Sequence, residues 1–280
     1  RWISENPKPD RKKYNLYLDG LTIYTTLDSR MQTYAENAVK EHMSNLQNAF
    51  FEQNTPKWNP TAPFLDLTEK EIERLMEQAM RRSERWRKMK LAGKTEDDIK
   101  ASFEEKTAMK IFSWKGEIDT VMSPIDSIRH YKHFLRSGMM SMDPQTGHVK
   151  AWVGGINYKH FQFDHVYQGK RQIGSTFKPF VYASAIDQLK LSPCDSFPDG
   201  FYCVEARKFG AHEAWCPKNS GDRYTGKRTL KNALANSVNT ISARLIDKVG
   251  PGPVSKLATD LGVSSKIPSV PSIALGTADL

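Results

Sequence analysis

Cysteine is scarce in this sequence, and long hydrophobic runs are missing. The 280 residues include 3 cysteines and no Cys-x-x-Cys pair, so a zinc knuckle is not expected. Cys194, Cys203 and Cys216 lie close together, and an odd number does not make a closed disulfide framework. A local Cys203–Cys216 bridge and free thiols both remain open at this point. No apolar run approaches the roughly 18 residues of a membrane span, so the chain as given is not expected to cross a bilayer.

The charge is unbalanced toward the basic side. The sequence has 41 Lys and Arg against 32 Asp and Glu, which gives a net charge of +9. This excess favours an anionic partner, and a nucleic acid, an acidic membrane face and an acidic polymer all qualify. No recognisable motif for reading nucleic acid is present. Hydrophobic residues make up 39% of the chain, which excludes a wholly disordered protein.

The N-terminal part of the sequence predicts a connector, a strand and a helix. Residues 1–20 are polar and basic, which is typical of a connector. Residues 21–26 are rich in β-branched and aromatic side chains, so we expect a strand there. Asp28 is a suitable N-cap for the helix that follows. Its apolar residues recur at helical spacing between Met31 and Met43.

The stretch 45–123 has a different character. It opens with a proline-containing loop and continues as a charged helical pattern, in which acidic residues precede basic ones as a helix dipole favours. A solvated helical insertion and a contact with an anionic surface both fit this pattern. Residues 123–126 then predict a capping box and a helix to about Arg136. His130 and His133 lie three apart on that helix, but two histidines alone do not form a metal site.

The rest of the sequence predicts mixed α and β structure. Residues 139–142 and 149–153 flank an Asp-Pro-Gln-Thr-Gly turn, which indicates a β-hairpin. Three helical segments follow, and Pro251 and Pro253 are expected to mark the end of the last one. The three segments are 175–190, 230–236 and 238–249.

Ser175 and Lys178 form the first candidate pair for catalysis. They lie three apart at the start of an apolar helical pattern, so they are neighbours on one helix face. A lysine in a dry site can lose its proton and then act as the base that activates a serine hydroxyl. The backbone N–H groups at a helix N-terminus can stabilise a developing oxyanion. The spacing alone is weak, but Gly174 and the upstream hairpin strengthen it.

Ser237 and Asn239 form the second candidate pair. They lie at a joint between two helical segments, where a hydroxyl and an amide two residues apart can point into one cleft. A helix N-cap is the alternative interpretation, because Ser and Asn supply such caps routinely. Together with Ser175 and Lys178, the pair favours a catalytic site.

The sequence resembles the transpeptidase region of a class A (bifunctional) penicillin-binding protein. Ser-x-x-Lys and a Ser-x-Asn triplet occur together in this family. The resemblance covers residues 20–44 and 137–280, and it leaves out the 45–123 insertion. It is carried by Tyr24–Asp28 with Gln32, Ala35 and Glu36, by Asp143–Gly155, by Arg171–Phe180 and by Ser272–Thr277.

The sequence departs from the family pattern in two respects. Ile173 stands where the family commonly has proline. No Lys-Thr-Gly or Lys-Ser-Gly occurs, although the family uses such a strand to bind the substrate carboxylate and complete the oxyanion hole. The resemblance places this strand beyond Leu280, and it places a glycosyltransferase domain and a membrane anchor before Arg1. We therefore expect residues 1–280 alone to be acylated poorly.

The resemblance implies an α+β penicillin-binding fold in three segments. Residues 1–44 would form the connector with the entry strand and helix. Residues 45–136 would form the charged, mainly helical insertion, and 137–280 the N-terminal part of the transpeptidase domain. The implied activity is D,D-transpeptidation of peptidoglycan stem peptides on the extracytoplasmic face of the inner membrane.

The resemblance also implies a role for each candidate residue. Ser175 would be the nucleophile, Lys178 its base, Ser237 a proton relay, and Asn239 a ligand for the substrate amide. Neither a metal nor a cofactor is implied. The expected partners are stem peptides ending in D-Ala-D-Ala, β-lactams, the membrane through an upstream anchor, and other proteins of cell-wall synthesis. A β-lactamase or penicillin sensor of the same fold, or a basic nucleic-acid module, are the alternatives.

Overall fold

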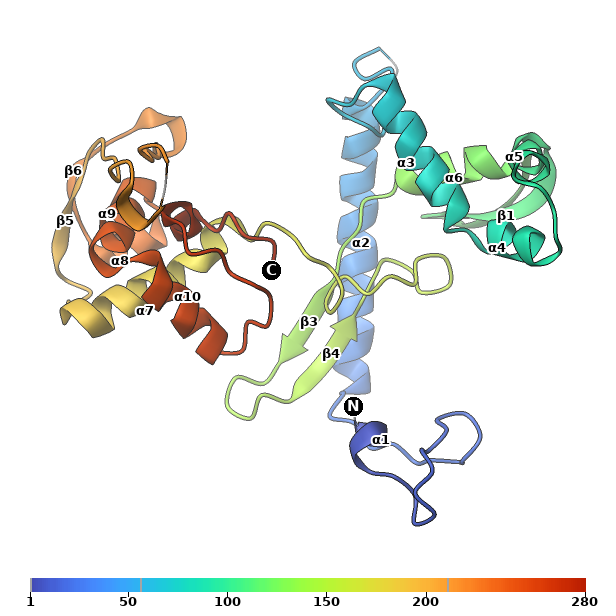
Figure 1. Ribbon diagram of the computed structural model, residues 1–280, viewed down its shortest axis with the longest axis horizontal. Coiled ribbons are helices and arrows are strands. Elements are labelled where there is room, and N and C mark those ends of the chain that lie inside the picture. Colours follow the sequence, from blue (N-terminus) through green and yellow to red (C-terminus); the bar gives the residue numbers. More distant parts are fainter. Residues whose placement is uncertain (1, 56, 211) are drawn as a thin grey trace. The chain divides into compact units, whose positions relative to one another are not determined.

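The computed structural model describes residues 2–55, 57–210 and 212–280 (Figure 1). The chain forms two compact units, Arg1–Gly169 and Lys170–Leu280, and we describe each by itself. Over the described ranges, strands pair only as two-stranded antiparallel ladders, and helices supply most of the regular structure. This is the predicted α+β class. No described helix combines the length and apolar character that a membrane span needs.

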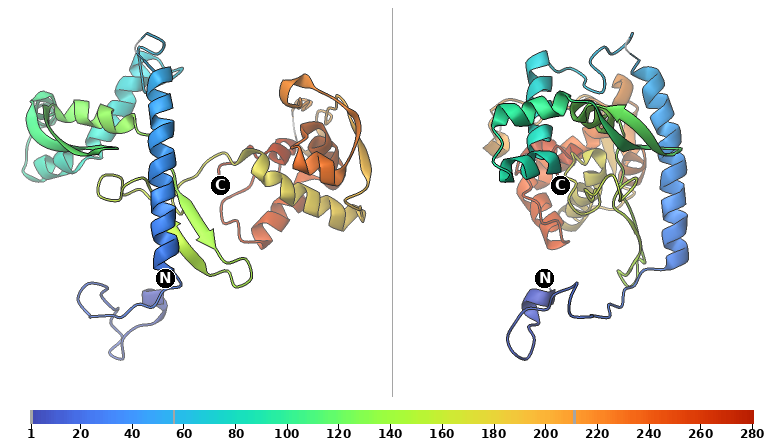
Figure 2. Two further views of the ribbon diagram at one scale, coloured as in Figure 1. Left: turned by 180° about the vertical axis from the view of Figure 1, so that it is seen from behind. Right: turned by 90° about the vertical axis from the view of Figure 1, so that its right-hand side faces the viewer.

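The centre of the first unit is a long helix that packs along a hairpin. Helix α2 (Ser29–Gln53) begins at Asp28, whose side chain accepts from the N–H groups of Arg30 and Met31. This confirms the predicted cap and the helix over Met31–Met43. The hairpin consists of β3 (Met139–Met142) and β4 (Val149–Val153), as predicted, and Figure 2 shows it beside α2 from two further sides. The shared core contains Ala35, Val39, Met43, Ala151 and Val153. A short helix, α1 (Trp2–Glu5), precedes them.

The predicted strand at residues 21–26 is not formed. Thr26 Oγ1 donates to Val149 O at 2.7 Å, and Asp28 N donates to Lys150 O at 2.9 Å, but no ladder develops. The Gln32 side chain instead bonds both the N–H and the C=O of Trp152, at 2.7 and 2.9 Å. Because this helical side chain occupies the edge of β4, a third strand cannot extend along it.

The region 57–135 of the first unit contains capped helices and a second hairpin. The side chains of Thr68, Ser83, Thr95 and Ser123 cap the four helices, which explains why the charged stretch folds as predicted. The last helix ends at Lys132, short of Arg136. The β1–β2 hairpin was not predicted. The elements are α3 (Glu69–Arg81), α4 (Glu84–Leu91), α5 (Glu96–Glu104), β1 (Thr107–Ser113), β2 (Gly116–Met122) and α6 (Pro124–Lys132).

The second unit surrounds two buried helices, α7 and α9. Their apolar residues form one core with the neighbouring helices, in which Val181, Ile241, Leu245 and Ile273 are fully buried. The elements are η1 (Gly174–Phe177), α7 (Lys178–Leu189), β5 (Ser196–Asp199), η2 (Lys208–Gly210), η3 (Ser220–Asp222), β6 (Gly226–Thr229), α8 (Leu230–Ala235), α9 (Asn239–Val249), α10 (Pro251–Asp260) and η4 (Pro271–Leu275). The three predicted helical segments are confirmed.

Two features of the second unit refine the sequence analysis. Pro251 does not end the helical region but begins α10, because Gly250 with a φ of +85° breaks the chain direction and proline suits a first helical position. Cys203 and Cys216 form a disulfide, and Cys194 is free and exposed. The bridge closes the loop between β5 and β6.

Candidate active site

Ser175 lies in a tight turn that leads into the buried helix α7. Gly174 has a φ of +58°, and its N–H donates to Gly276 O at 3.0 Å, which fixes the entry to the turn. Phe177 is fully buried, and the backbone N–H of Lys178 donates to Ser175 O. Ser175 itself is exposed. The turn therefore presents Ser175 to solvent and directs the following residues into the core.

Lys178 is buried, and its ammonium group has a complete set of partners. Its side chain reaches across to the joint between α8 and α9, although only 1% of the residue is exposed. Nζ donates to Ser237 O at 2.6 Å, to Ser237 Oγ at 2.9 Å and to Asn239 Oδ1 at 2.6 Å. Burial lowers the pKa of Lys178 from 10.5 to about 8, because the charged form is poorly solvated there. The three bonds use all the donors of an ammonium.

Ser237 occupies a strained backbone position at the end of α8. Its N–H donates to Leu234 O at 3.0 Å, and the N–H of Val238 donates to Ala233 O at 2.9 Å. These two bonds define a Schellman helix end, whose central residue is left-handed and usually glycine. Ser237 has a φ of +53° there. A side chain at this position costs about 1 kcal/mol or more. The hydroxyl that contacts Lys178 is thus held at a place where glycine would be less strained.

Asn239 is the first residue of α9. The loop that contains Lys218 and Asn219 bonds both its backbone N–H and its side-chain NH₂. Its Oδ1 accepts a lysine N–H as described above, and its Nδ2 donates to Lys218 O at 2.8 Å. Val238, at the N-cap, makes no side-chain capping bond. Asn219 supplies that cap from the loop, since its Oδ1 accepts from Asn239 N at 2.9 Å and from Thr240 N at 3.2 Å.

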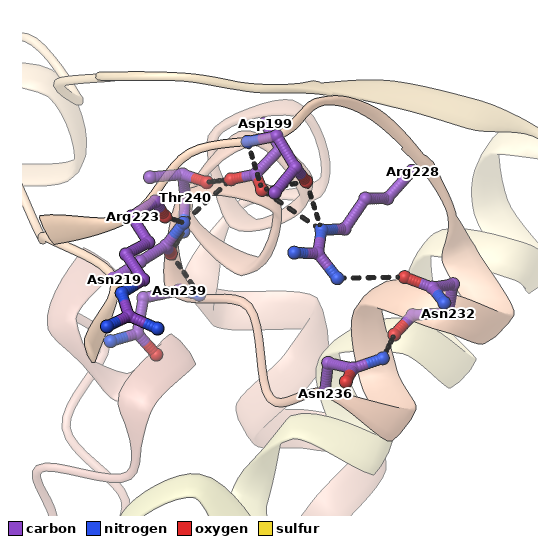
Figure 3. Close-up of polar contacts among 9 residues, drawn as sticks. Asp199, Asn219, Arg223, Arg228, Asn232, Asn236, Asn239 and Thr240 are labelled. Atoms are coloured by element: carbon purple, nitrogen blue, oxygen red, sulfur yellow. Dashed lines mark hydrogen bonds and ion pairs between the residues drawn. The ribbon is translucent and has the colours of Figure 1, made fainter. Parts of the chain in front are cut away.

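A buried carboxylate, Asp199, ties this loop to α9 (Figure 3). Its side chain is fully buried and forms an ion pair with Arg228 at 3.0 Å. It also accepts from Asn219 Nδ2 at 2.7 Å, Thr240 Oγ1 at 2.9 Å and Thr225 Oγ1 at 3.0 Å. Burial alone would raise the pKa of Asp199, but the hydrogen bonds from Asn219, Thr240, Thr225 and Arg228 together lower it. The carboxylate is therefore ionised at neutral pH.

The structure brings three of the four predicted site residues into direct contact. Lys178, Ser237 and Asn239 share the hydrogen bonds given above. Ser175 lies on the turn just before Lys178, and within the described residues no hydrogen bond joins its Oγ to Lys178 Nζ. Sequence reasoning missed Asn219 and Asp199. Asn219 lies 20 residues before its partner Asn239 in α9, and Asp199 lies 41 residues before its partner Thr240. No spacing rule predicts hydrogen bonds between segments so far apart in the sequence.

His130 in α6 and His133 at its C-cap both make hydrogen bonds to backbone carbonyls. His130 Nε2 bonds with Phe112 O at 3.0 Å, and His133 Nδ1 with Arg129 O at 2.9 Å. Across the described ranges, no group of three or more His, Cys, Asp or Glu side chains could hold a metal ion.

Two family models match the chain, and together they cover most of it. The penicillin-binding protein middle domain matches residues 59–135, and the penicillin binding protein transpeptidase domain matches residues 138–272. The chain belongs to the penicillin-binding proteins. The second match includes all four predicted site residues and both Asp199 and Asn219.

Relatives of this penicillin-binding protein include several penicillin-binding proteins 1A, which confirms the resemblance to class A. The protein of Neisseria flavescens is 37% identical over 147 residues, or 52% of this chain and 18% of that protein. The protein of Aquifex aeolicus is 28% identical over 273 residues, or 94% of this chain and 36% of that protein. The chain thus spans between 18% and 36% of the length of these two relatives.

A solved structure confirms the fold of this penicillin-binding protein. Penicillin-binding protein 1A from Haemophilus influenzae matches with a TM-score of 0.55 and 20% identity, over 92% of this chain and 40% of that one. The middle-domain match also extends the resemblance into the stretch 45–123, where the sequence analysis found none. That stretch does not contain the motifs by which we recognised the family, so sequence inspection overlooked it. The predicted segment boundaries at 44/45 and 136/137 stay a prediction.

Proposed function

We propose that this chain carries the acylation residues of a D,D-transpeptidase that cross-links peptidoglycan stem peptides. Ser175 attacks the carbonyl of the penultimate D-alanine, the terminal D-alanine leaves, and an amine of a second stem peptide resolves the acyl-enzyme. β-Lactams acylate the same serine. The chain is then part of a larger peptidoglycan synthase. The observation that carries this proposal is the buried Lys178, held between Ser237 and Asn239 with its pKa lowered to about 8.

The partners of Lys178 support distinct roles for Ser237 and Asn239. A neutral amine has two N–H donors and one lone pair, so one of the three present bonds must change when Lys178 loses its proton. Ser237 O and Asn239 Oδ1 can only accept, and they retain the two donors. Ser237 Oγ can turn from acceptor to donor. Ser237 is therefore the partner able to relay a proton from Lys178 to the leaving amine, while Asn239 orients Lys178.

An extracytoplasmic location fits the same proposal. The Cys203–Cys216 disulfide is the kind of bond that persists in an oxidising compartment such as the periplasm. The net charge of +9 suits a surface near anionic lipids and wall polymer. We propose that the protein works at the outer face of the inner membrane on stem peptides ending in D-Ala-D-Ala.

The test is acylation of Ser175 by a fluorescent penicillin, in the longest form of the protein that its gene encodes. Mass spectrometry should place the adduct on the peptide that contains Ser175, and Ser175→Ala should abolish it. Thr176→Val is the matched control, because Thr176 is also exposed and its Oγ1 bonds only locally, with Ile173 O at 2.6 Å. Labelling that survives in Ser175→Ala would refute the proposal.

The same preparation separates this function from its alternatives. A β-lactamase of this fold would hydrolyse its acyl-enzyme and turn over nitrocefin continuously. A transpeptidase should give one burst that matches the amount of protein and then a stable adduct. Formation of cross-linked product from stem-peptide substrates distinguishes the enzyme from a penicillin sensor, which would be acylated without forming cross-links.

A further inference from the structure

We propose that Asn219 is a positioning residue for the Ser237–Asn239 segment, and that the carboxylate of Asp199 fixes the orientation of its amide. The proposal rests on the proposed function, because it gives the acylation site an additional part. Neither residue touches Ser175 or Lys178. Both act through α9, whose first residue, Asn239, holds the lysine. Figure 3 shows Asp199 and Asn219 beside Asn239 and Thr240 of α9.

The N-terminus of α9 is capped from another part of the chain. Val238 at the N-cap makes no side-chain capping bond, so the first N–H groups of the helix need acceptors from elsewhere. Asn219 Oδ1 accepts from two of them, Asn239 N and Thr240 N. The residue that places the site amide is therefore capped by a loop 20 residues away rather than by its own neighbour.

The Asn219 amide has one defined orientation. An asparagine side chain can present either its oxygen or its NH₂ to a neighbour. Asp199 decides between them, because an ionised carboxylate accepts only, and it takes Nδ2 of Asn219 at 2.7 Å. Arg223 O accepts from the same NH₂ group at 3.0 Å. These two bonds occupy Nδ2, so Oδ1 is the atom that accepts from the N–H groups of α9.

The Asn239 amide also has one defined orientation. Its Nδ2 donates to Lys218 O, which belongs to the residue just before Asn219. Its Oδ1 is thereby turned toward Lys178 Nζ at 2.6 Å. A flipped amide would present an NH₂ group to an ammonium, which is repulsive. Asp199 thus orients the Asn219 amide, Asn219 holds the backbone N–H of Asn239, and the carbonyl of the adjacent Lys218 turns the Asn239 amide toward the candidate base.

The test is an exchange of the two interacting groups. Asn219→Asp keeps an acceptor for α9, and a negative charge suits a helix N-terminus, so a residue that only caps the helix would tolerate it. A positioning residue would not, because two carboxylates would then face each other at hydrogen-bond distance. We expect the rate constant for penicillin acylation to fall about ten- to hundredfold. The double variant Asp199→Asn with Asn219→Asp restores an amide–carboxylate pair, and we expect it to recover most of that loss.

The matched control is Asn232→Asp. Asn232 is exposed on α8 and bonds Arg228 Nη1 at 3.0 Å, so the variant adds the same charge to the same cluster without touching Asn219. Its acylation rate should remain within about threefold of wild type. Loss of activity in this control, full activity in Asn219→Asp, or a double variant no better than Asn219→Asp would each overturn the proposal.

A second measurement keeps the inference separate from the proposed function. The titration of Lys178 can be followed by NMR in the 280-residue chain without any substrate. Asn219→Ala should lower the pKa of Lys178 below its wild-type value, because a buried ammonium that loses a fixed acceptor is less stable. Asn232→Ala should leave it unchanged. If the wild-type protein is not acylated but the pKa shifts as stated, the function fails and the positioning role stands. An unshifted pKa in Asn219→Ala refutes the positioning role.

Discussion

At the scale of single residues, the site depends on one lysine kept at the border between its two protonation states. Lys178 is buried enough for its pKa to fall to about 8, yet three acceptors surround its Nζ. Burial disfavours the ammonium, whereas the acceptors favour it. A general base works best when its pKa lies near the working pH, and this balance brings an ordinary lysine into that range.

The rate of acylation should therefore rise with pH and level off above about 8. Only neutral Lys178 can take the Ser175 proton, and its fraction grows as pH passes the pKa of about 8. An unperturbed lysine, with a pKa near 10.5, would place the rise more than two pH units higher. The measurement is the rate constant for penicillin acylation between about pH 6 and 10. A flat profile over this range would exclude Lys178 as the base.

The same lysine leaves a signature in stability, which serves as an independent check. Its folded pKa lies below its unfolded pKa, so between about 8 and 10.5 the unfolded chain binds more protons than the folded one. The free energy of unfolding contributed by Lys178 must then rise with pH across that window. Below about pH 8 the penalty for burying the charge is fully present. The free energy of unfolding can be measured with urea at several pH values for wild type and Lys178→Met. Its rise with pH between about 8 and 10.5 should appear in the wild type and be absent in Lys178→Met.

At the scale of elements, the site forms where helix ends meet. The start of α7 carries Lys178, the end of α8 carries Ser237, and the start of α9 carries Asn239. Helix ends leave backbone N–H and C=O groups without partners inside the helix, so they are the natural places for side chains to converge. The Schellman end of α8 is what brings the Ser237 hydroxyl to Lys178.

Substituting Ser237 by glycine or by alanine should distinguish the cost of its strained backbone from the contribution of its hydroxyl to acylation. Both substitutions remove the hydroxyl that contacts Lys178 Nζ, so both should slow acylation to a similar extent. Only glycine relieves the left-handed backbone at a φ of +53°. Ser237→Gly should therefore be more stable than Ser237→Ala by about 1 kcal/mol. Thermal unfolding and acylation rates of the two variants test this, and equal stabilities would argue against the strained helix end.

The turn that carries Ser175 depends on a close approach of two glycines. Residues 171–174 run antiparallel to residues 276–280, and a Cβ on Gly276 would collide with the carbonyl oxygen of Gly174. Gly276→Ala should destabilise the second unit and abolish acylation, because this collision lies one residue before Ser175, the proposed nucleophile.

Gly210→Ala is the control for that substitution. Gly210 has a similar φ of +75°, and a Cβ added there would meet no atom within 4 Å. The variant therefore isolates the cost of the backbone conformation, about 1 kcal/mol. Gly276→Ala should cost at least about 2 kcal/mol more in urea unfolding. A Gly276→Ala protein that is as stable and as readily acylated as the control would show that the turn tolerates displacement.

At the scale of the whole molecule, each unit has its own hydrophobic core. In the first unit, small cores lie under α2, under α3 and around Trp86 and Phe112. In the second, one larger core surrounds α7 and α9. Every described residue of the candidate site lies in the second unit, and its packing depends on that larger core. Loss of stability in this unit is therefore the general route by which distant substitutions would impair acylation.

Much of the local structure and the choice of candidate site residues follow from the sequence alone. Asp28 and Ser123 cap helices where predicted, and the 139–153 hairpin and the helices around Ser175 and Ser237 form as expected. These features depend on neighbouring residues, whose propensities act before any tertiary contact. The candidate pair Ser175 and Lys178 was recognisable because its spacing corresponds to one helical turn.

Other features were decided only by the tertiary structure. Residues 21–26 have strand propensity, but the Gln32 side chain occupies the edge that they would have paired with. The left-handed φ of Ser237 and the bonds of Asn219 arise from contacts between chain segments that no local pattern connects. Asp199 meets Thr240 from 41 residues away. The sequence by itself thus determined which groups could do the chemistry, whereas long-range hydrogen bonds in the folded chain decided which way those groups point.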